Sequence, residues 1–275
     1  MKPMRGQSFI YLALTAVLLG GCGNTQTASP PSAAPQASEP SKPPIDPADL
    51  VQAVEADLYG TGKEEVYSLA KVPQAGVDIP AGWKLYEGAI ERVSVENPEA
   101  DLHARVEMDD LNHDTKPEVL LYRESTGSAG GIKLNIYQPD QNAWKPLFIV
   151  DTNPQISEKD RFDVSYIGEY KVRFSDKQTG LQAVIPLDPN EAKDMKEMLP
   201  RITTWIDPIN EYAVADVDGD QIKEVVTKQA VIGVSHPHRI AILETTYKLQ
   251  DDKFAANKLT LLTPDGKKLG EAPVK

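Results

Sequence analysis

Acidic side chains recur at every second position in the segment ADVDGDQIKEVV, which spans residues 215–226. A calcium ion prefers six to eight hard oxygen ligands, and alternate side chains of a tight loop can point to one centre. Gly219 lies where such a loop must bend sharply. We therefore predict a calcium site here. Its candidate ligands are Asp216, Asp218, Asp220, the backbone carbonyl of Ile222, and Glu224.

A second segment, DDLNHDTKPEVLLY, repeats the same spacing of oxygen-bearing side chains. The corresponding residues, Asp110, Asn112, Asp114 and Glu118, are the candidate ligands of a second calcium site. Both segments continue into short apolar runs that are typical of β-strands. An EF-hand needs a twelve-residue loop with glycine at the sixth position and flanking helices. Glycine is fourth in the loop at 216 and the flanks are strand-like, so we exclude an EF-hand.

The two acidic segments start 106 residues apart, which suggests a step of 53 residues. One step before Asp110 falls on Asp57, in a degenerate loop that keeps Thr61 and Glu65. One step after Asp110 falls on Asp163, where the metal-type residues are missing but a strand, a glycine-containing turn and a strand are expected. Repeats starting near 57, 110, 163 and 216 predict a solenoid, a propeller or an array of small units.

Aromatic pairs mark two further hairpins. Tyr137 and Trp144 flank one polar turn, and Tyr247 and Phe254 flank another, with the same separation. Aromatic residues at matched positions of a repeat are expected to pack one sheet on the next. We therefore predict that all four belong to the core.

The third repeat is expected to contain a short helix. Two alternating strands around Gly180 precede the segment DPNEAKDMKEMLP. Asp188 is a suitable N-cap, Pro189 suits the first helical position, and Glu191 completes a capping box. We expect about three helical turns, ending at Pro200.

The acidic loops resemble the short calcium loops of FG-GAP and VCBS repeats, which form the blades of integrin α-type β-propellers. The resemblance implies an all-β, propeller-like array of about four antiparallel blades, with the short helix in the third. This sequence departs from the family at the ninth position, where glutamate replaces the usual aspartate. Thr115 and Gln221 stand where the family has glycine, whereas Gly62 keeps it. A closed propeller and an open array both remain possible.

The N-terminus predicts a lipid anchor. Lys2 and Arg5 precede an apolar run that is shorter than the roughly 20 residues of a membrane-spanning helix. The run ends in Leu-Gly-Gly-Cys, which resembles the lipobox of bacterial lipoproteins and implies an acylated Cys22. A secreted protein with an incidental cysteine is the alternative. We expect a signal peptide at 1–21, a lipidated and disordered Pro/Ser/Ala-rich tether at 22–48, and the propeller-like domain at 49–275.

Charge and motifs limit the possible functions. The net charge of −12 is unfavourable for binding nucleic acid. The sequence lacks a G-x-S-x-G elbow, a P-loop, an H-E-x-x-H motif and a dinucleotide fingerprint. The four histidines, His103, His113, His236 and His238, form no recognised catalytic motif.

We therefore expect a non-catalytic binding or scaffold module, held outside the cytoplasm on the cell membrane through the lipid on Cys22. Its ligand would be a protein or polysaccharide of the cell envelope. The alternative function is an extracytoplasmic polysaccharide hydrolase or lyase assisted by calcium, since acidic pairs are plentiful.

Overall fold

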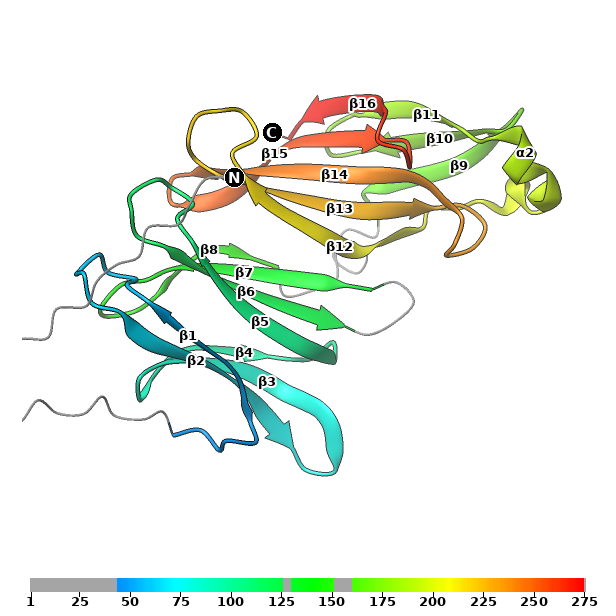
Figure 1. The fold of residues 1–275 in the computed structure, drawn as a ribbon. Helices are drawn as coiled ribbons and strands as arrows, with labels where there is room; N and C mark the ends of the chain where they lie inside the picture. Colours follow the sequence, from blue (N-terminus) through cyan, green and yellow to red (C-terminus); the bar gives the residue numbers. More distant parts are fainter. Residues whose placement is uncertain (1–43, 126–129, 151–159, 275) are drawn as a thin grey trace, which may run out of the picture. The chain divides into compact units, whose positions relative to one another are not determined.

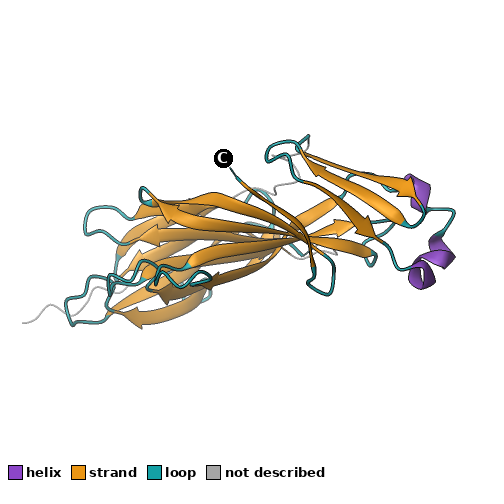
Figure 2. Ribbon diagram, turned by 90° about the horizontal axis from the view of Figure 1, so that it is seen from above, coloured by secondary structure: helices purple, strands orange, loops and turns teal. Residues whose placement is uncertain are grey.

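The computed structural model describes residues 44–125, 130–150 and 160–274, and these residues form an all-β structure (Figures 1 and 2). Their strands make four antiparallel sheets. In the described parts of the chain, no helix is both long and apolar enough to cross a membrane. The predicted signal peptide, Cys22 and most of the predicted tether lie outside the described residues.

Each sheet is built from strands that are consecutive in the chain. Sheet I contains β1 (Leu50–Ala56), β2 (Glu65–Gln74), β3 (Val77–Glu87) and β4 (Ile90–Glu96). Sheet II contains β5 (Asp101–Asp109), β6 (Glu118–Ser125), β7 (Ile132–Gln138) and β8 (Lys145–Ile149). Sheet III contains β9 (Phe162–Gly168), β10 (Lys171–Asp176) and β11 (Gln182–Pro186). Sheet IV contains β12 (Ile206–Ala215), β13 (Glu224–Ile232), β14 (Arg239–Gln250), β15 (Lys253–Leu262) and β16 (Lys268–Pro273).

Sheet II is buried on both faces. Successive side chains of a strand point to opposite faces. On β6, Val119 and Leu121 belong to a core shared with sheet I. Leu120 and Tyr122 belong to a core shared with sheet IV. The first six residues of β6 are accordingly all buried.

Sheet IV is long enough to cover two other sheets. Val225, near the start of β13, packs in the core shared with sheet II. Val231, near the end of β13, packs in the core shared with sheet III. These residues are an even number of positions apart with no bulge between them, so they point to the same face. One face of sheet IV therefore supports sheet II at one end and sheet III at the other.

The sheets do not pack in the order of the chain. The cores join sheet I to sheet II, sheet II to sheet IV, and sheet IV to sheet III. A propeller of four consecutive four-stranded blades would place sheet III beside sheet II, and the observed strand numbers are four, four, three and five. The C-terminal strand β16 pairs with β15 and extends its own sheet. The described sheets are therefore open, and a closed propeller is not seen.

One pair on the outer face of sheet IV is polar where the matching pair of sheet II is apolar. In sheet II, Tyr122 pairs with Leu134, and both are buried. At the matching positions of sheet IV, Lys228 pairs with Glu244, and both are partly exposed. Val226 and Ala230, which point to the same face of β13 as Lys228, are nevertheless buried.

The predicted helix is shorter than expected. Asp188 caps α2 (Pro189–Ala192) by accepting a hydrogen bond from the Asn190 N–H at 2.7 Å, as the sequence indicates. Only four residues are α-helical, and the 3₁₀ turns η1 (Lys193–Met195) and η2 (Leu199–Arg201) follow. Ala192 is the only buried residue of α2. Met195 and Leu199 pack against the same core as Ala192, but they do so from 3₁₀ turns and not from one continuous α-helix.

The predicted aromatic core residues are buried or half-buried. Tyr137 and Trp144 pack between sheets I and II. Phe254 and Tyr247 pack between sheets II and IV, and both rings contact the Phe148 ring. The hairpin pattern in the sequence therefore predicted part of both cores.

Two apolar residues at the same loop position give a test of this packing. Leu111 is fully buried in the core of sheets II and IV, whereas Val217 is 54% exposed. We expect Leu111→Ala to lower the free energy of unfolding by about 2 to 5 kcal/mol, because it leaves a cavity. The matched control Val217→Ala is expected to change it by less than about 0.5 kcal/mol. Denaturant unfolding measures both, and equal losses would contradict the stacking of sheet IV on sheet II.

Candidate cation-binding loops

Three of the four predicted repeat starts occupy the same structural position. Asp57, Asp110 and Asp216 each come directly after the first strand of sheets I, II and IV. The acid eight residues later begins the second strand in each case, at Glu65, Glu118 and Glu224. The flanking elements are strands, which agrees with the exclusion of an EF-hand.

The fourth predicted start does not occupy this position, although the predicted strand, glycine-containing turn and strand are present as β9, Gly168 and β10. Asp163 lies within β9, one residue after that strand begins, and pairs with Ser175 of β10. The turn between β9 and β10 is formed around Glu169 and Tyr170. A constant numerical step therefore lands inside a strand in sheet III, because this sheet begins at a different distance along the chain.

The first aspartate of each loop binds the backbone of its own turn. Asp57 accepts hydrogen bonds from the N–H groups of Thr61 at 3.0 Å and Gly62 at 2.6 Å. Asp110 accepts equivalent bonds from the fifth and sixth loop residues, and Asp216 from the fourth and sixth. Hydrogen bonds to the ionised form lower the pKa of Asp57, chiefly the one from Thr61. The loops are thus closed by side chain–backbone bonds.

The fourth and sixth positions of all three loops have left-handed backbone geometry. Their φ angles lie between 62° and 83° for the set Gly60, Gly62, His113, Thr115, Gly219 and Gln221. Glycine adopts this conformation without steric cost, whereas a β-branched residue rarely does. Thr115 and Gln221 nevertheless adopt the conformation of Gly62, so the three loops share one backbone geometry at the sixth position.

The ninth-position glutamates of sheets II and IV are buried. Glu118 and Glu224 are 1% and 2% exposed. Each accepts a hydrogen bond at 2.9 Å from the N–H of the second loop residue, Leu111 or Val217. One oxygen of each glutamate thus holds its loop closed.

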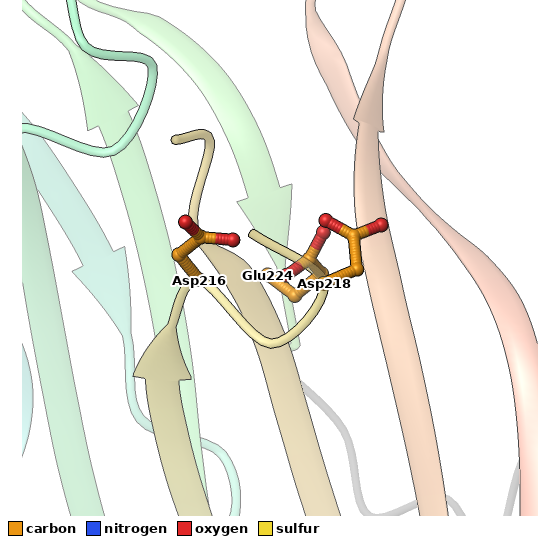
Figure 3. Close-up of side chains that lie close together, drawn as sticks. All are labelled: Asp216, Asp218 and Glu224. Carbon is orange, nitrogen blue, oxygen red and sulfur yellow. The ribbon is translucent and has the colours of Figure 1, made fainter. Parts of the chain in front are cut away.

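The loop at 216 gathers carboxylates suited to a cation (Figure 3). Oxygen atoms of Asp216, Asp218 and Glu224 all lie within 4.8 Å of one another. Among the described residues, this is the one acidic group with metal-like spacing. Asp220 lies beside it and accepts the Ile222 N–H at 2.9 Å.

A lysine from the neighbouring strand already reaches this carboxylate group. The Lys248 ammonium on β14 contacts an oxygen of Asp218 directly and lies 3.2 Å from Glu224 and 3.8 Å from Asp220. The hydrogen bond from Lys248 lowers the pKa of Asp218, and the same contact raises the pKa of Lys248. Strand β14 thus places a positive charge against the carboxylates that were predicted to bind a metal ion.

The loop at 110 is neutralised differently. The Asn112 amide donates to Asp114 at 3.3 Å and to Glu118 at 3.1 Å. Burial raises the pKa of Glu118 to about 7, assisted by the nearby charges of Asp114 and Asp110. Asn112 was predicted to give an oxygen to a metal, but its nitrogen faces these carboxylates in the structure.

The degenerate loop at 57 has no comparable group of acids. Glu65 forms an ion pair with Lys63 at 2.5 Å, and this pair is solvent-exposed. Thr61 donates its hydroxyl to Asp57 at 3.3 Å. The loop in sheet I is therefore a closed polar turn without a gathered set of ligands.

The loops of adjacent sheets contact one another. The backbone N–H of Lys223 donates to the Leu111 carbonyl at 2.8 Å. The Lys223 ammonium also pairs with Asp109 at 2.5 Å. The loop at 216 is thus attached to sheet II as well as to its own sheet.

Among the described residues, no histidine side chain bonds to the acidic residues of these loops. His113 is exposed in the loop at 110, and His103 is exposed on β5. His236 lies 3.4 Å from Asp207 and packs edge-on against Trp205. His238 accepts the Val234 N–H through Nδ1 at 3.2 Å.

Sequence reasoning missed Lys248, which belongs to a strand that starts 15 residues after the loop ends. The register offers a signal in retrospect. Tyr137 pairs with the second residue of β6, and Tyr247 pairs with the second residue of β13. The residues that follow them, Gln138 and Lys248, therefore occupy equivalent positions in sheets II and IV. A positively charged side chain therefore faces the acidic loop in sheet IV, and an uncharged amide occupies the same place in sheet II.

Comparison with protein families gives one match. Residues 160–262 are similar to the family described as the YybI C-terminal domain. The matched segment contains sheet III and nearly all of sheet IV, which share a core. Neither the curated proteins nor the solved structures contain a match to the chain.

The buried Glu118 predicts a pH dependence of stability. Its pKa is about 7 in the folded protein against 4.5 for an ordinary glutamate, so the folded state binds more protons between these values. The free energy of unfolding should therefore fall as pH rises from about 4.5 to about 7, by up to roughly 3 kcal/mol in the absence of divalent cations. Urea unfolding at several pH values measures this slope.

Glu118→Gln is expected to remove this part of the pH dependence, because glutamine keeps an acceptor for the Leu111 N–H and cannot ionise. The exposed Glu107 on β5 provides the control Glu107→Gln, which should leave the slope intact. An unchanged slope in Glu118→Gln would show that the buried carboxyl is not its origin.

Proposed function

We propose that this protein is a lipid-anchored, extracytoplasmic binding or scaffold module without catalytic activity, in which calcium braces the loop at 216. The observation that supports it most is the repeated acidic loop at the same end of sheets I, II and IV. Loops at one end of a sheet stack form a surface positioned by a rigid scaffold, which suits binding.

The residues of the loop at 216 fit a hard divalent cation. Asp216, Asp218 and Glu224 offer carboxylate oxygens within the spacing of a metal site. A calcium ion there would replace the Lys248 ammonium, which neutralises the same oxygens. The loop at 110 fits less well as it stands, because the Asn112 amide nitrogen faces Glu118.

The anchor and the location rest on the sequence. The lipobox-like Leu-Gly-Gly-Cys places acylation at Cys22, and two or three acyl chains suffice for stable membrane attachment. The Pro/Ser/Ala-rich segment that follows is long enough to separate the sheets from the lipid surface.

An envelope polysaccharide hydrolase or lyase is the less favoured function. Glycosidases need two carboxyl groups facing one cleft, one of them free to give a proton. The gathered carboxylates of this chain instead accept backbone N–H groups of their own loops. Saturable binding of an envelope component without release of cleaved sugar would support the proposed module.

Calcium is expected to stabilise the full-length protein, purified in detergent. At about 1 mM calcium and a dissociation constant near 10⁻⁴ M, one site adds about 1.4 kcal/mol, which raises Tm by about 3 °C relative to chelator. Asp218→Ala should remove most of this shift. Differential scanning calorimetry measures it, and identical Tm values for the unmodified protein in calcium and chelator would refute calcium binding.

Lys248 provides a second test of the same site. Lys248→Gln removes the internal ammonium, so it should lower Tm in chelator and enlarge the shift caused by calcium. The exposed Lys253 on the next strand gives the control Lys253→Gln, for which both values should stay unchanged. A calcium shift that disappears in Lys248→Gln would contradict competition between the lysine and the ion.

The anchor is tested by Cys22→Ser. The unmodified protein should sediment with membranes and partition into detergent, whereas Cys22→Ser should be recovered in the soluble fraction. Metabolic labelling with a radioactive fatty acid should mark only the unmodified protein. A labelled or membrane-bound Cys22→Ser protein would contradict lipidation at this residue.

A further inference from the structure

A groove lies on the side of sheets III and IV that carries α2. It has a volume of ≈ 410 Å³ and is lined by α2, the start of β14 and the turn between β15 and β16. This volume lies within the usual range for small-molecule sites. Its lining includes Leu187, Ala192 and Ile240, which are buried. None of the residues that line the groove belongs to an acidic loop, so the groove is a separate site.

His238 is fixed in position in the lining of this groove. Its Nδ1 accepts the Val234 N–H at 3.2 Å, and the Gly233 N–H donates to the His238 carbonyl at 2.8 Å. A Cβ atom on Gly233 would lie 2.4 Å from Nδ1, so only glycine leaves room for the ring. The backbone of this turn therefore determines where the imidazole lies.

The same hydrogen bond sets the tautomer of His238. Because Nδ1 is the acceptor, the neutral ring carries its proton on Nε2. Burial lowers the pKa of His238 and so favours this neutral form. In the described residues, Nε2 has no hydrogen-bond partner, which leaves one N–H donor for a ligand.

Charged groups of both signs line the same groove as His238. Arg239 is exposed, and within the described chain its guanidinium makes no ion pair. The lining also contains three carboxylates, from Asp188, Glu191 and Asp265. Asp188 caps α2, and Asp265 accepts the Thr263 hydroxyl, while Glu191 has no such bond in the part that the structure describes. With His238 neutral, three negative charges face one positive charge.

We propose that this groove binds an amino acid or peptide end that carries a carboxylate and two amino groups. The carboxylate would accept hydrogen bonds from His238 Nε2 and the Arg239 guanidinium, and guanidinium groups suit carboxylates by their planar, forked geometry. The amino groups would pair with Glu191 and Asp265. A ligand with net charge +1 complements the excess of acid in the lining.

This inference names a ligand for the proposed binding function, and it rests on that function without depending on the anchor or on calcium. The probe is L-lysine, titrated calorimetrically into full-length protein in detergent with a chelator present. We expect saturable binding below roughly 10 mM. Cadaverine lacks the carboxylate and norleucine lacks the side-chain amine, so both should bind at least tenfold more weakly.

Matched variants separate the groove from nonspecific binding. Arg239→Gln and Glu191→Gln should each weaken L-lysine binding roughly tenfold, because each removes a charge-assisted hydrogen bond. The controls Arg173→Gln and Glu197→Gln replace exposed residues outside the lining and should bind normally. Circular dichroism would verify that all four variants remain folded.

The proposal is overturned if L-lysine does not saturate, if cadaverine binds equally well, or if the groove variants bind like the controls. These outcomes leave the calcium-dependent Tm and the membrane attachment untouched. A failure of this ligand class is therefore distinguishable from a failure of the proposed function.

Discussion

The burial of sheet II on both faces is the constraint on which the rest of the structure depends. Strand β6 has apolar side chains on both faces of sheet II, so this sheet is stable only when two other sheets cover it. Sheet I covers one face with four strands, and one half of sheet IV covers the other. The remaining half of sheet IV supports sheet III, so a single core arrangement joins all four sheets.

The acidic loops are part of this arrangement as well as candidate sites. Buried Glu118 and Glu224 close their loops by accepting backbone N–H groups, and Lys223 attaches one loop to the next sheet. Burying a charged carboxylate costs free energy unless the charge is paired or removed, and the two loops differ in how they do this. One uses the Lys248 ammonium, and the other uses an asparagine amide and a raised pKa. Both loops therefore hold their geometry through contacts with side chains of the chain itself.

The sequence predicted the strands better than their packing. Alternating carboxylates followed by apolar runs identified the first turn of sheets I, II and IV, because loop closure requires acceptors at fixed positions. The order of packing could not be predicted, since the continuous apolar run at 119–122 indicates that both faces of β6 are buried but not which sheet covers them. Lys248 was missed because it comes from a different strand, and strand pairing brings it to the loop. The cap of α2 was predicted from Asp188, whereas the change from α-helix to 3₁₀ turns after Ala192 was not predicted.

The order in which the sheets pack affects the chain during its synthesis. Sheets I and II are synthesised first. One face of sheet II then stays exposed until sheet IV is made, because sheet III is translated in between and does not cover it. Until the C-terminal strands leave the ribosome, residues such as Leu120 and Ile136 remain uncovered, and exposed strands of this kind favour aggregation. A chain truncated before residue 206 would lack sheet IV altogether. Sheet II can therefore fold completely only after the last quarter of the polypeptide has been made, and until then it would need protection by a chaperone.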